Sequence, residues 1–283
     1  MKIDIDILLA TYNGSHYLDK QIQSIIDQTY PFWRIIARDD GSTDETIEIL
    51  RKWKNILHER LVILDEDCPK NLGVIANFEK LLKYSTSKYI AFCDQDDFWY
   101  KDKLEIFINN FILLEKKYGL NLPYLVFSDL EVTDSKLEPI AGSLWKLQKI
   151  NPYIVNDPRK LALSNCVTGC AMMINQNAAK IAVPMLNAMM HDWWIALCVS
   201  KNNGKFGIIK EKTISYRQHS YNVVGAKKQG FLIWLKKIIY LLIKKDDFNK
   251  CFYQAKALNI YNNKYYFFFV KSFSIIRRLF NYV

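Results

Sequence analysis

The segment Tyr89–Trp99, YIAFCDQDDFW, joins a run of mostly apolar residues to three carboxylates within four positions. Asp94, Asp96 and Asp97 repel one another when ionised, and the two aromatic residues that end the segment make ionisation still less favourable. The apolar run predicts a buried strand. The carboxylates after it predict a hard divalent cation, Mg²⁺ or Mn²⁺, that all three share. A solvated acidic turn that caps the next helix is the alternative interpretation.

The first part of the chain alternates between strand-like and helical segments. Buried strands are predicted at 5–10, 34–39, 61–64 and 89–93. Helices are predicted between them, at 15–28, from a capping box formed by Ser42 and Glu45, and from Gly73. Such alternation predicts a parallel sheet with right-handed crossovers, for which 3-2-1-4 is the usual strand order.

The pattern loosens after Lys101. Helices are expected at 102–117 and 191–201, strands at 124–132, 168–174 and 213–219, and an irregular segment at 135–165. The predicted fold class is therefore α/β, with a Rossmann-like, mostly parallel sheet flanked by helices. We expect two domains, a globular body at 1–225 and a helical tail at 226–283, with the boundary near Gly225.

The positive charge is concentrated at the end of the chain. The net charge is +10, yet residues 1–224 carry 27 basic and 27 acidic residues, whereas residues 225–283 carry 12 basic residues against Asp246 and Asp247. No nucleic-acid partner is expected, because the body is neutral where nucleic-acid grooves are basic.

The same tail is rich in aromatic residues. The segments FLIWLKKIIYLLIKK (231–245) and YYFFFVKSFSIIRRLF (265–280) place Lys236, Lys237, Lys271, Arg277 and Arg278 among apolar turns. Basic amphipathic helices of this kind lie in membrane interfaces, where each basic residue contributes about 1 kcal/mol near anionic lipid. The tail is therefore expected to bind the inner membrane surface. Packing on the body and a homodimer contact are the alternatives.

The cysteines and the hydropathy of the chain predict the cellular compartment of the protein. The six cysteines are scattered and form no C-x-x-C pair, which favours reduced, buried thiols in the cytosol. The N-terminal MKIDIDILLATYNG enters a strand directly and resembles no signal peptide. Because no uninterrupted apolar span reaches transmembrane length, the expected location is cytoplasmic and peripheral on the inner face of the cell membrane.

Polar clusters follow three of the predicted strands. TYNG follows the first, DDGS the second and DQDD the fourth. Ligands of open α/β sheets bind beyond the carboxyl ends of the strands. With the order 3-2-1-4, these clusters are expected to line one crevice.

At these clusters the chain resembles a known family. ILLATYNGSHYLDKQIQSIIDQTY, IIARDDGSTDET, NLGVIANFEKLL and YIAFCDQDDFW closely resemble the GT-A-fold family 2 glycosyltransferases. With NCVTGCAMMIN, HDWWIALCVSK and YRQHSYNVVGA, the resemblance covers about residues 3–226 and is nearest the rhamnosyltransferase-like branch of bacterial surface-polysaccharide synthesis. It implies an inverting, metal-dependent enzyme that moves a sugar, rhamnose favoured, from a dTDP or UDP donor to a lipid-linked or saccharide acceptor.

The resemblance also assigns roles to individual positions. The positions implied for donor binding follow strand ends or lie in the segment that closes over the donor: Ala10, Thr11, Asn13, Asp40, Asn71, Gly73, Asn77, Asp94 and Gln95. Asp40 is the position that hydrogen-bonds the base. Asp94 to Asp96 match the Asp-x-Asp motif, with Asp96 as the metal ligand, and His219 is implied as a further metal or diphosphate contact or, alternatively, a packed residue.

Asp192 in HDWW matches the catalytic base. It lies at a predicted helix start, where the dipole lowers its pKa, so its basicity has to come from burial. His191 is expected to orient Asp192, to bind the acceptor or to cap the helix. Trp193 and Trp194 are expected to stack on sugar or to face the core, and for Thr168 and Gly169 the alternatives are a sugar pocket and a buried strand.

Two other functions compete with the glycosyltransferase. A sugar-nucleotide nucleotidyltransferase uses a related fold, but its Gly-rich basic loop is missing, because TYNGSHYL contains no Lys or Arg. A non-catalytic module could bind membrane or polyanions through the tail, and it would not need the carboxylate cluster.

Overall fold

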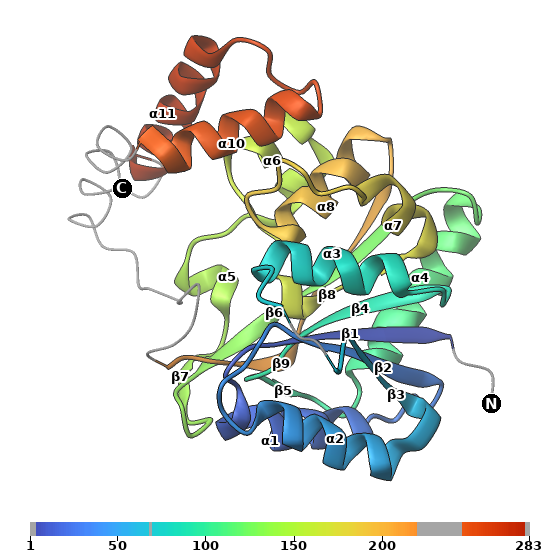
Figure 1. Ribbon diagram of the computed structural model, residues 1–283. Helices are drawn as coiled ribbons and strands as arrows, with labels where there is room; N and C mark the ends of the chain where they lie inside the picture. Colours follow the sequence, from blue (N-terminus) through green and yellow to red (C-terminus); the bar gives the residue numbers. More distant parts are fainter. Residues whose placement is uncertain (1–3, 68–69, 220–244, 281–283) are drawn as a thin grey trace.

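A computed structural model describes residues 4–67, 70–219 and 245–280 of the chain (Figure 1). The strands are β1 (Ile5–Thr11), β2 (Trp33–Asp39), β3 (Leu61–Leu64), β4 (Tyr89–Asp94), β5 (Phe98–Trp99), β6 (Tyr124–Thr133), β7 (Pro139–Ala141), β8 (Met172–Asn175) and β9 (Lys205–Arg217). They form one sheet in the order β3-β2-β1-β4-β8-β6-β9-β5, with β7 paired to β6. The predicted order 3-2-1-4 is confirmed.

The sheet changes character at β8. β3, β2, β1 and β4 are parallel neighbours, and β6 and β9 are also parallel. β8 runs antiparallel to both β4 and β6, so it joins the two parallel groups. The carboxyl ends of β1, β2 and β4 consequently meet at one edge, as expected for a site of this fold class.

Helices cover both faces of the sheet (Figure 1). The longer ones are α1 (Ser15–Ile26), α2 (Thr46–Leu57), α3 (Val74–Tyr84), α4 (Lys103–Tyr118), α6 (Pro158–Leu163), α7 (Gln176–Ala182), α8 (His191–Lys201), α10 (Lys245–Ala257) and α11 (Lys264–Phe280). Successive residues of β1 point to opposite faces. Ile7 and Leu9 pack with α1, α2 and α4, whereas Leu8 packs with α3 and α8.

Three expected elements differ from those observed. The segment expected as a strand at 168–174 begins as a 3-10 turn, Gly169–Ala171, and only then enters β8. The strand expected at 213–219 starts earlier, because β9 pairs with β6 from Lys205 onward. The irregular segment at 135–165 contains β7, α6, a short helix α5 (Leu144–Leu147) and a 3-10 turn (Pro152–Asn156).

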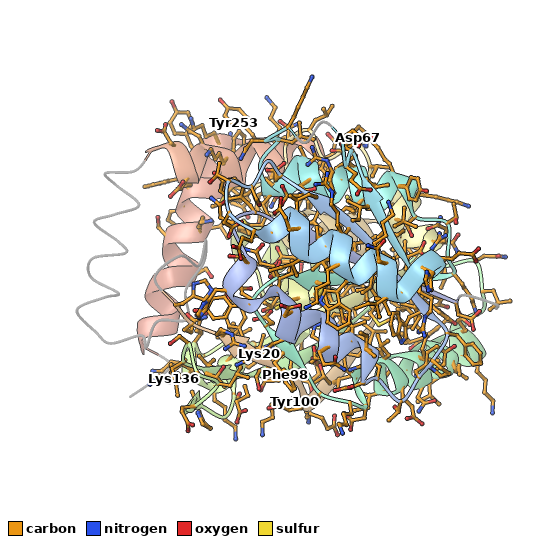
Figure 2. All side chains as sticks on the ribbon, turned by 60° about the horizontal axis from the view of Figure 1, so that its bottom comes forward. Lys20, Asp67, Phe98, Tyr100, Lys136 and Tyr253 are labelled. Carbon is orange, nitrogen blue, oxygen red and sulfur yellow. The ribbon has the colours of Figure 1, made fainter. Side chains whose placement is uncertain are left out.

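The C-terminal helices pack on the body. Phe252, Ala255 and Phe267 belong to the same buried cluster as Trp193 and the other core residues of α8. Lys271 is buried, with its ammonium nitrogen 5.6 Å from the centroid of the Trp193 ring, so this lysine lies on the face of α11 that packs on the body. Figure 2 shows α10 and α11 along one side of the molecule, with Tyr253 at the surface.

Parts of the tail prediction lie outside the described residues, namely the boundary near Gly225 and the segment 231–244. The side chains of Arg277 and Arg278 are likewise outside the description. Of the cysteines, the five that the structure describes are free and buried, and Cys68 falls outside it. Within the described ranges, no helix combines the length and hydropathy needed to cross a bilayer.

Candidate active site

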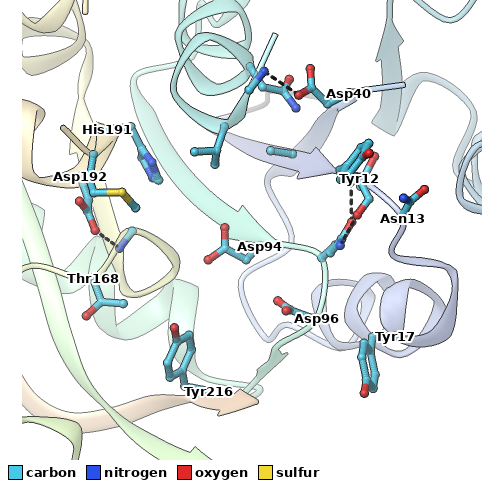
Figure 3. Close-up of a pocket in the computed structure, with 18 of the residues that line it drawn as sticks. Tyr12, Asn13, Tyr17, Asp40, Asp94, Asp96, Thr168, His191, Asp192 and Tyr216 are labelled. Atoms are coloured by element: carbon cyan, nitrogen blue, oxygen red, sulfur yellow. Dashed lines mark hydrogen bonds between the residues drawn. The ribbon is translucent and has the colours of Figure 1, made fainter. Parts of the chain in front are cut away.

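A pocket of about 1130 Å³ lies at the carboxyl ends of β1, β2 and β4, where the sequence predicts a crevice (Figure 3). Its lining includes the residues to which the family resemblance assigns a donor, metal or base role: Ala10, Thr11, Asn13, Asp40, Asn71, Asn77, Asp94, Gln95, Asp96, Asp192 and His219. Gly73, Thr168, Gly169 and His191 line it as well. Residues that are up to 209 positions apart in the chain, from Ala10 to His219, thus share one cavity.

The loops after β1 and β4 are joined side by side. The strand register places Ala10 opposite Asp94. Just beyond it, the Gln95 amide donates to the Tyr12 carbonyl at 2.9 Å and accepts from the Tyr12 backbone N–H at 2.8 Å (Figure 3). A side chain that pairs with a neighbouring backbone in both directions imitates a strand pairing, so Gln95 fixes the spacing of the two loops.

The turn after β2 is organised by Asp39. Its carboxylate accepts hydrogen bonds from the hydroxyls of Thr11 and Ser42 and from the backbone N–H groups of Gly41 and Ser42. Gly41 has a φ of 83°, which glycine adopts without strain. The predicted capping box at Ser42 is wrong, because Asp39 takes the Ser42 hydroxyl and α2 begins only at Thr46.

Asp40 holds the loop that precedes α3 through hydrogen bonds to its backbone. One of its oxygens accepts from Arg38 Nη1 and the Leu72 backbone N–H, each at 2.8 Å, and the other accepts from the Gly73 backbone N–H at 2.8 Å. The predicted base-binding carboxylate therefore also holds the segment that is predicted to close over the donor. A carboxylate has about four acceptor positions, so one remains for a ligand.

Arg38 is fully buried beneath this loop. Besides Asp40, it donates to Asp65 at 2.8 Å, to the Lys70 carbonyl at 2.7 Å and to Asn77 Oδ1 at 3.2 Å. Asn77 is also buried and returns a hydrogen bond to the Arg38 carbonyl at 3.3 Å. The guanidinium thus ties three segments of the pocket wall together, a role that the sequence analysis missed.

The three carboxylates of DQDD do not converge on one point. Asp96 faces His219, with Oδ2 2.7 Å from Nε2, and the His219 ring stacks on Tyr17 at a centroid distance of 4.8 Å. Asp97 is turned into the interior, where it accepts from the Arg217 backbone N–H at 3.1 Å and burial raises its pKa well above the usual range. Asp97 does not line the pocket, and the single ion predicted for all three carboxylates stays a prediction.

Asp94 lines the pocket, as Asp96 does, and also lies near the buried Asp97. Burial raises its pKa to about 7, and repulsion by Asp96 and Asp192 adds to the shift. Its ligand atom lies within 4.8 Å of those of Asp97 and Cys170. Carboxylate oxygens suit both Mg²⁺ and Mn²⁺, and an imidazole ligand favours Mn²⁺ of the two. Asp96 and His219 therefore fit a divalent ion at the pocket surface, with Asp94 beside them.

A buried cation lies under the acidic loop. Lys103, at the start of α4, is fully buried, donates to the Cys170 carbonyl at 2.6 Å and lies 4.2 Å from the centroid of the Trp99 ring. Burial lowers the pKa of its ammonium to about 8. No pattern in the sequence distinguishes this lysine from the exposed lysines of other helices, which is why its position was not predicted.

Asp192 is fixed at the opposite wall of the pocket, in the first turn of α8. Its Oδ2 accepts from the Gly169 backbone N–H at 3.0 Å and its Oδ1 from the Asn165 amide at 3.2 Å. Burial raises its pKa to about 6, even though the N–H donors act in the opposite direction. The structure thus supplies the burial that a basic carboxylate at a helix start requires.

The residues after Asp192 are core residues. Both tryptophans are buried, and their indole N–H groups donate to the carbonyls of Leu161 and Ala182 at 2.7 Å. Neither lines the pocket, so the alternative in which Trp193 or Trp194 stacks on sugar is wrong.

The family follows from a comparison with known proteins. Residues 6–180 match the model of the family described as Glycosyl transferase family 2. The chain belongs to this family. It is a glycosyltransferase, and the nucleotidyltransferase and non-catalytic alternatives are set aside.

Several curated members of family 2 are similar to the chain. The dTDP-rhamnosyl transferase RfbG of Shigella flexneri is 27% identical over 225 residues, which cover 77% of this chain and 74% of RfbG. WfgD of Escherichia coli, a UDP-Glc:alpha-D-GlcNAc-diphosphoundecaprenol beta-1,3-glucosyltransferase, is 27% identical over 70% of each chain. TuaG of Bacillus subtilis, a putative teichuronic acid biosynthesis glycosyltransferase, is 36% identical, but the match spans only 39% of its length.

Solved structures confirm the GT-A fold. Residues 1–349 of TarS from S. aureus, solved in complex with UDP-GlcNAc, align with a TM-score of 0.56 at 16% identity, over 88% of this chain and 69% of that one. The mannosyltransferase PcManGT from Pyrobaculum calidifontis, in complex with GDP-Man and Mn²⁺, aligns with a TM-score of 0.56 at 13% identity, over 100% of this chain and 76% of that one.

Proposed function

We propose that this enzyme transfers a sugar, with rhamnose favoured, from a dTDP- or UDP-activated donor to a hydroxyl of a lipid-linked or saccharide acceptor. The product belongs to a cell-surface polysaccharide. The names of RfbG and WfgD support the donor and acceptor classes. The observation that carries the proposal is the pairing, across one pocket, of a buried carboxylate of raised pKa, Asp192, with the Asp96–His219 pair.

The proposed chemistry is a single displacement with inversion. The acceptor oxygen attacks the anomeric carbon while its proton passes to Asp192. The bond from the anomeric carbon to the diphosphate breaks, and the nucleoside diphosphate leaves with the electron pair. Proton removal by a positioned base contributes roughly 10²–10⁴-fold. A bound Mn²⁺ or Mg²⁺, held by Asp96 and His219, supplies a Lewis acid for the charge on the leaving diphosphate.

The donor is proposed to lie along the carboxyl ends of β1, β2 and β4. Ala10, Thr11 and Asn13 contact the nucleotide, and Asp40 uses its remaining acceptor position for the base. Asn71, Gly73 and Asn77 close over it, held in place by the contacts of Asp40 and Arg38. Asp94 and Gln95 border the diphosphate.

The enzyme is proposed to work in the cytoplasm, on the inner surface of the cell membrane. α11 supports this placement because its inner face, Phe267 and Lys271, packs on the body while its outer face exposes aromatic side chains. These are Tyr265, Tyr266, Phe268, Phe269 and Phe273. Aromatic residues with neighbouring basic residues suit a headgroup layer. The alternative is a homodimer formed through the same face, and the vesicle-binding test in the Discussion distinguishes the two.

The test of the donor site is calorimetric binding of dTDP, UDP and GDP, each with Mn²⁺ and with EDTA. We expect dTDP or UDP to bind only with Mn²⁺, and Asp96→Ala and His219→Ala to lose that binding while keeping the wild-type unfolding temperature. Equal binding in EDTA would contradict the metal site, and binding of none of the three would contradict the proposed donor class.

A further inference from the structure

His191 faces the pocket beside the proposed base. It is the first residue of α8, only 3% of the residue is exposed, and it lines the cavity (Figure 3). Its ring stacks on Phe78 at a centroid distance of 4.0 Å and lies 5.5 Å from the centroid of Phe92. The imidazole is therefore held in one orientation by aromatic packing.

Both nitrogens of this ring lack a hydrogen-bond partner among the residues that the structure describes. Buried polar atoms are nearly always paired, and leaving one unpaired costs stability. Burial also lowers the pKa of His191 to about 3, so the ring is neutral at physiological pH. A neutral imidazole offers one donor and one acceptor, and sugar hydroxyl groups, which both donate and accept, match that pair.

The neighbouring turn leaves room for the ring. A Cβ atom on Gly169 would lie 2.5 Å from His191 Nε2, closer than such atoms approach. The backbone N–H of the same glycine holds Asp192. One residue therefore positions the carboxylate and accommodates the imidazole, which places both groups on the same wall of the pocket.

The packing of His191 also indicates which sugar it faces. Phe78 belongs to α3, which carries Asn77, and Phe92 belongs to β4, which ends at Asp94. These are the elements that border the proposed donor. In the displacement proposed above, the transferred ring has to lie between the diphosphate near Asp96 and the carboxylate of Asp192, which is the region that His191 adjoins.

We propose that His191 is a substrate-binding residue whose unpaired ring nitrogens hydrogen-bond hydroxyl groups of the donor sugar and so help to select the sugar that is transferred. This inference rests on the proposed function. It goes beyond that function by naming a residue that recognises the sugar part of the donor rather than the nucleotide part.

The experiment compares wild type with His191→Leu, His191→Asn and His191→Gln. Calorimetry in Mn²⁺ measures binding of UDP and dTDP, and of UDP-glucose and dTDP-rhamnose. We expect His191→Leu to bind UDP and dTDP as wild type does, and to bind the preferred nucleotide sugar about tenfold more weakly, the loss expected for one or two hydrogen bonds. The Asn amide lies near the position of Nδ1 and the Gln amide near that of Nε2, so the variant that recovers affinity identifies the nitrogen used.

Thermal unfolding separates a binding role from a packing role. Since the ring nitrogens have no partner in the described structure, His191→Leu should unfold at the wild-type temperature or above. A lower unfolding temperature together with weaker UDP or dTDP binding would identify a packing residue and overturn the inference.

Two further results would also overturn it. One is equal nucleotide-sugar affinity in wild type and His191→Leu. The other is unchanged nucleotide-sugar affinity with a raised KM for the acceptor, which would place the contact on the acceptor. In each case wild type still binds nucleotide and the proposed function stands. Failure of the proposed function is recognised separately, because wild type itself would then bind none of the four probes.

Discussion

The backbone N–H of Gly169 lies 3.0 Å from Oδ2 of Asp192, and it joins the turn before β8 to the first turn of α8. With the Asn165 amide on the other oxygen, it fixes the direction in which the carboxylate faces the pocket. In its proposed role as the base, a carboxylate that is fixed in this way can receive the acceptor proton without reorganising first.

Replacing Asp192 with Asn should therefore remove transfer and spare donor binding. We expect kcat to fall roughly 10²–10⁴-fold, the usual contribution of a general base, while Mn²⁺-dependent nucleotide binding stays at the wild-type level. Initial rates and calorimetry measure the two quantities. Glu59→Gln, an exposed carboxylate in the 3-10 turn His58–Arg60, is the matched control. Full activity of Asp192→Asn would show that another group takes the proton.

The pH dependence of the rate should report Asp192. The proposed base acts as a carboxylate, and burial raises the pKa of Asp192 to about 6. The active form is therefore present above this pH, and kcat/KM should fall as the pH drops through about 6. Saturating Mn²⁺ keeps Asp94 ionised, because a nearby cation lowers a carboxylate pKa. A rate that stays constant from pH 8 to pH 5 would exclude a titrating base of this kind.

Gly169→Ala should impair the reaction because the added methyl group displaces the His191 ring or the turn that holds Asp192. The added methyl group would lie 2.5 Å from His191 Nε2, so the ring or the turn has to move. We expect lower kcat and weaker nucleotide-sugar binding, with UDP or dTDP binding retained. Gly142→Ala is the control, because nothing lies within 4 Å of the Cβ position there. Equal kinetics for the two variants would contradict the close approach at Gly169.

Arg38→Met should destabilise the whole domain. The guanidinium is fully buried and pairs with Asp40 at 2.8 Å, so its removal leaves a buried carboxylate without its cation. Loss of one partner from a buried pair costs about 3–5 kcal/mol of unfolding free energy, which urea denaturation measures. The control is Arg51→Met, whose pair with Glu66 is half-exposed and for which a change below about 1 kcal/mol is expected. Similar losses for both variants would mean that the Arg38 network contributes no special stability.

The outer face of α11 should control membrane binding. Replacing Tyr265 and Phe269 with Ser removes two exposed aromatic side chains, and we expect affinity for phosphatidylglycerol vesicles to fall roughly tenfold or more, since burying such a side chain is worth about 1.5–3 kcal/mol. Leu113→Ser, an exposed apolar site on α4, is the control. Unchanged vesicle binding with a loss of dimer in sedimentation would assign this face to a homodimer instead.

The sequence predicts β1 to β4 well, because in this part of the chain strands and helices alternate regularly. Three of the four buried strands, 5–10, 34–39 and 89–93, each end in a polar cluster, and periodicity and topology rules place those clusters together. That is why the pocket residues from Ala10 to Asp96 could be expected in one cavity. The helix predicted at 191–201 also matches α8, so Asp192 was placed at a helix start.

The remainder depends on contacts that a linear pattern does not carry. β9 was predicted too short because Lys210, Glu211 and Lys212 are exposed in its middle, next to register shifts in its pairing with β6. Arg38 and Lys103 are charges whose burial is possible only with their specific partners, and a single sequence does not reveal those partners. Asp97 resembles Asp96 in the sequence and differs only in the direction that the loop gives it.

The packing of Phe267 and Lys271 over Trp193 has a practical consequence for anyone who shortens this enzyme. A protein ending at Arg217 would keep the entire sheet and, apart from His219, every residue with a predicted role in the pocket. It would also remove α10 and α11, which pack on α6 and on Trp193 of α8, and so expose an aromatic surface next to the helix that carries Asp192. Poor solubility of such a fragment would therefore say little about the chemistry, and the catalytic unit is better taken to extend through α11.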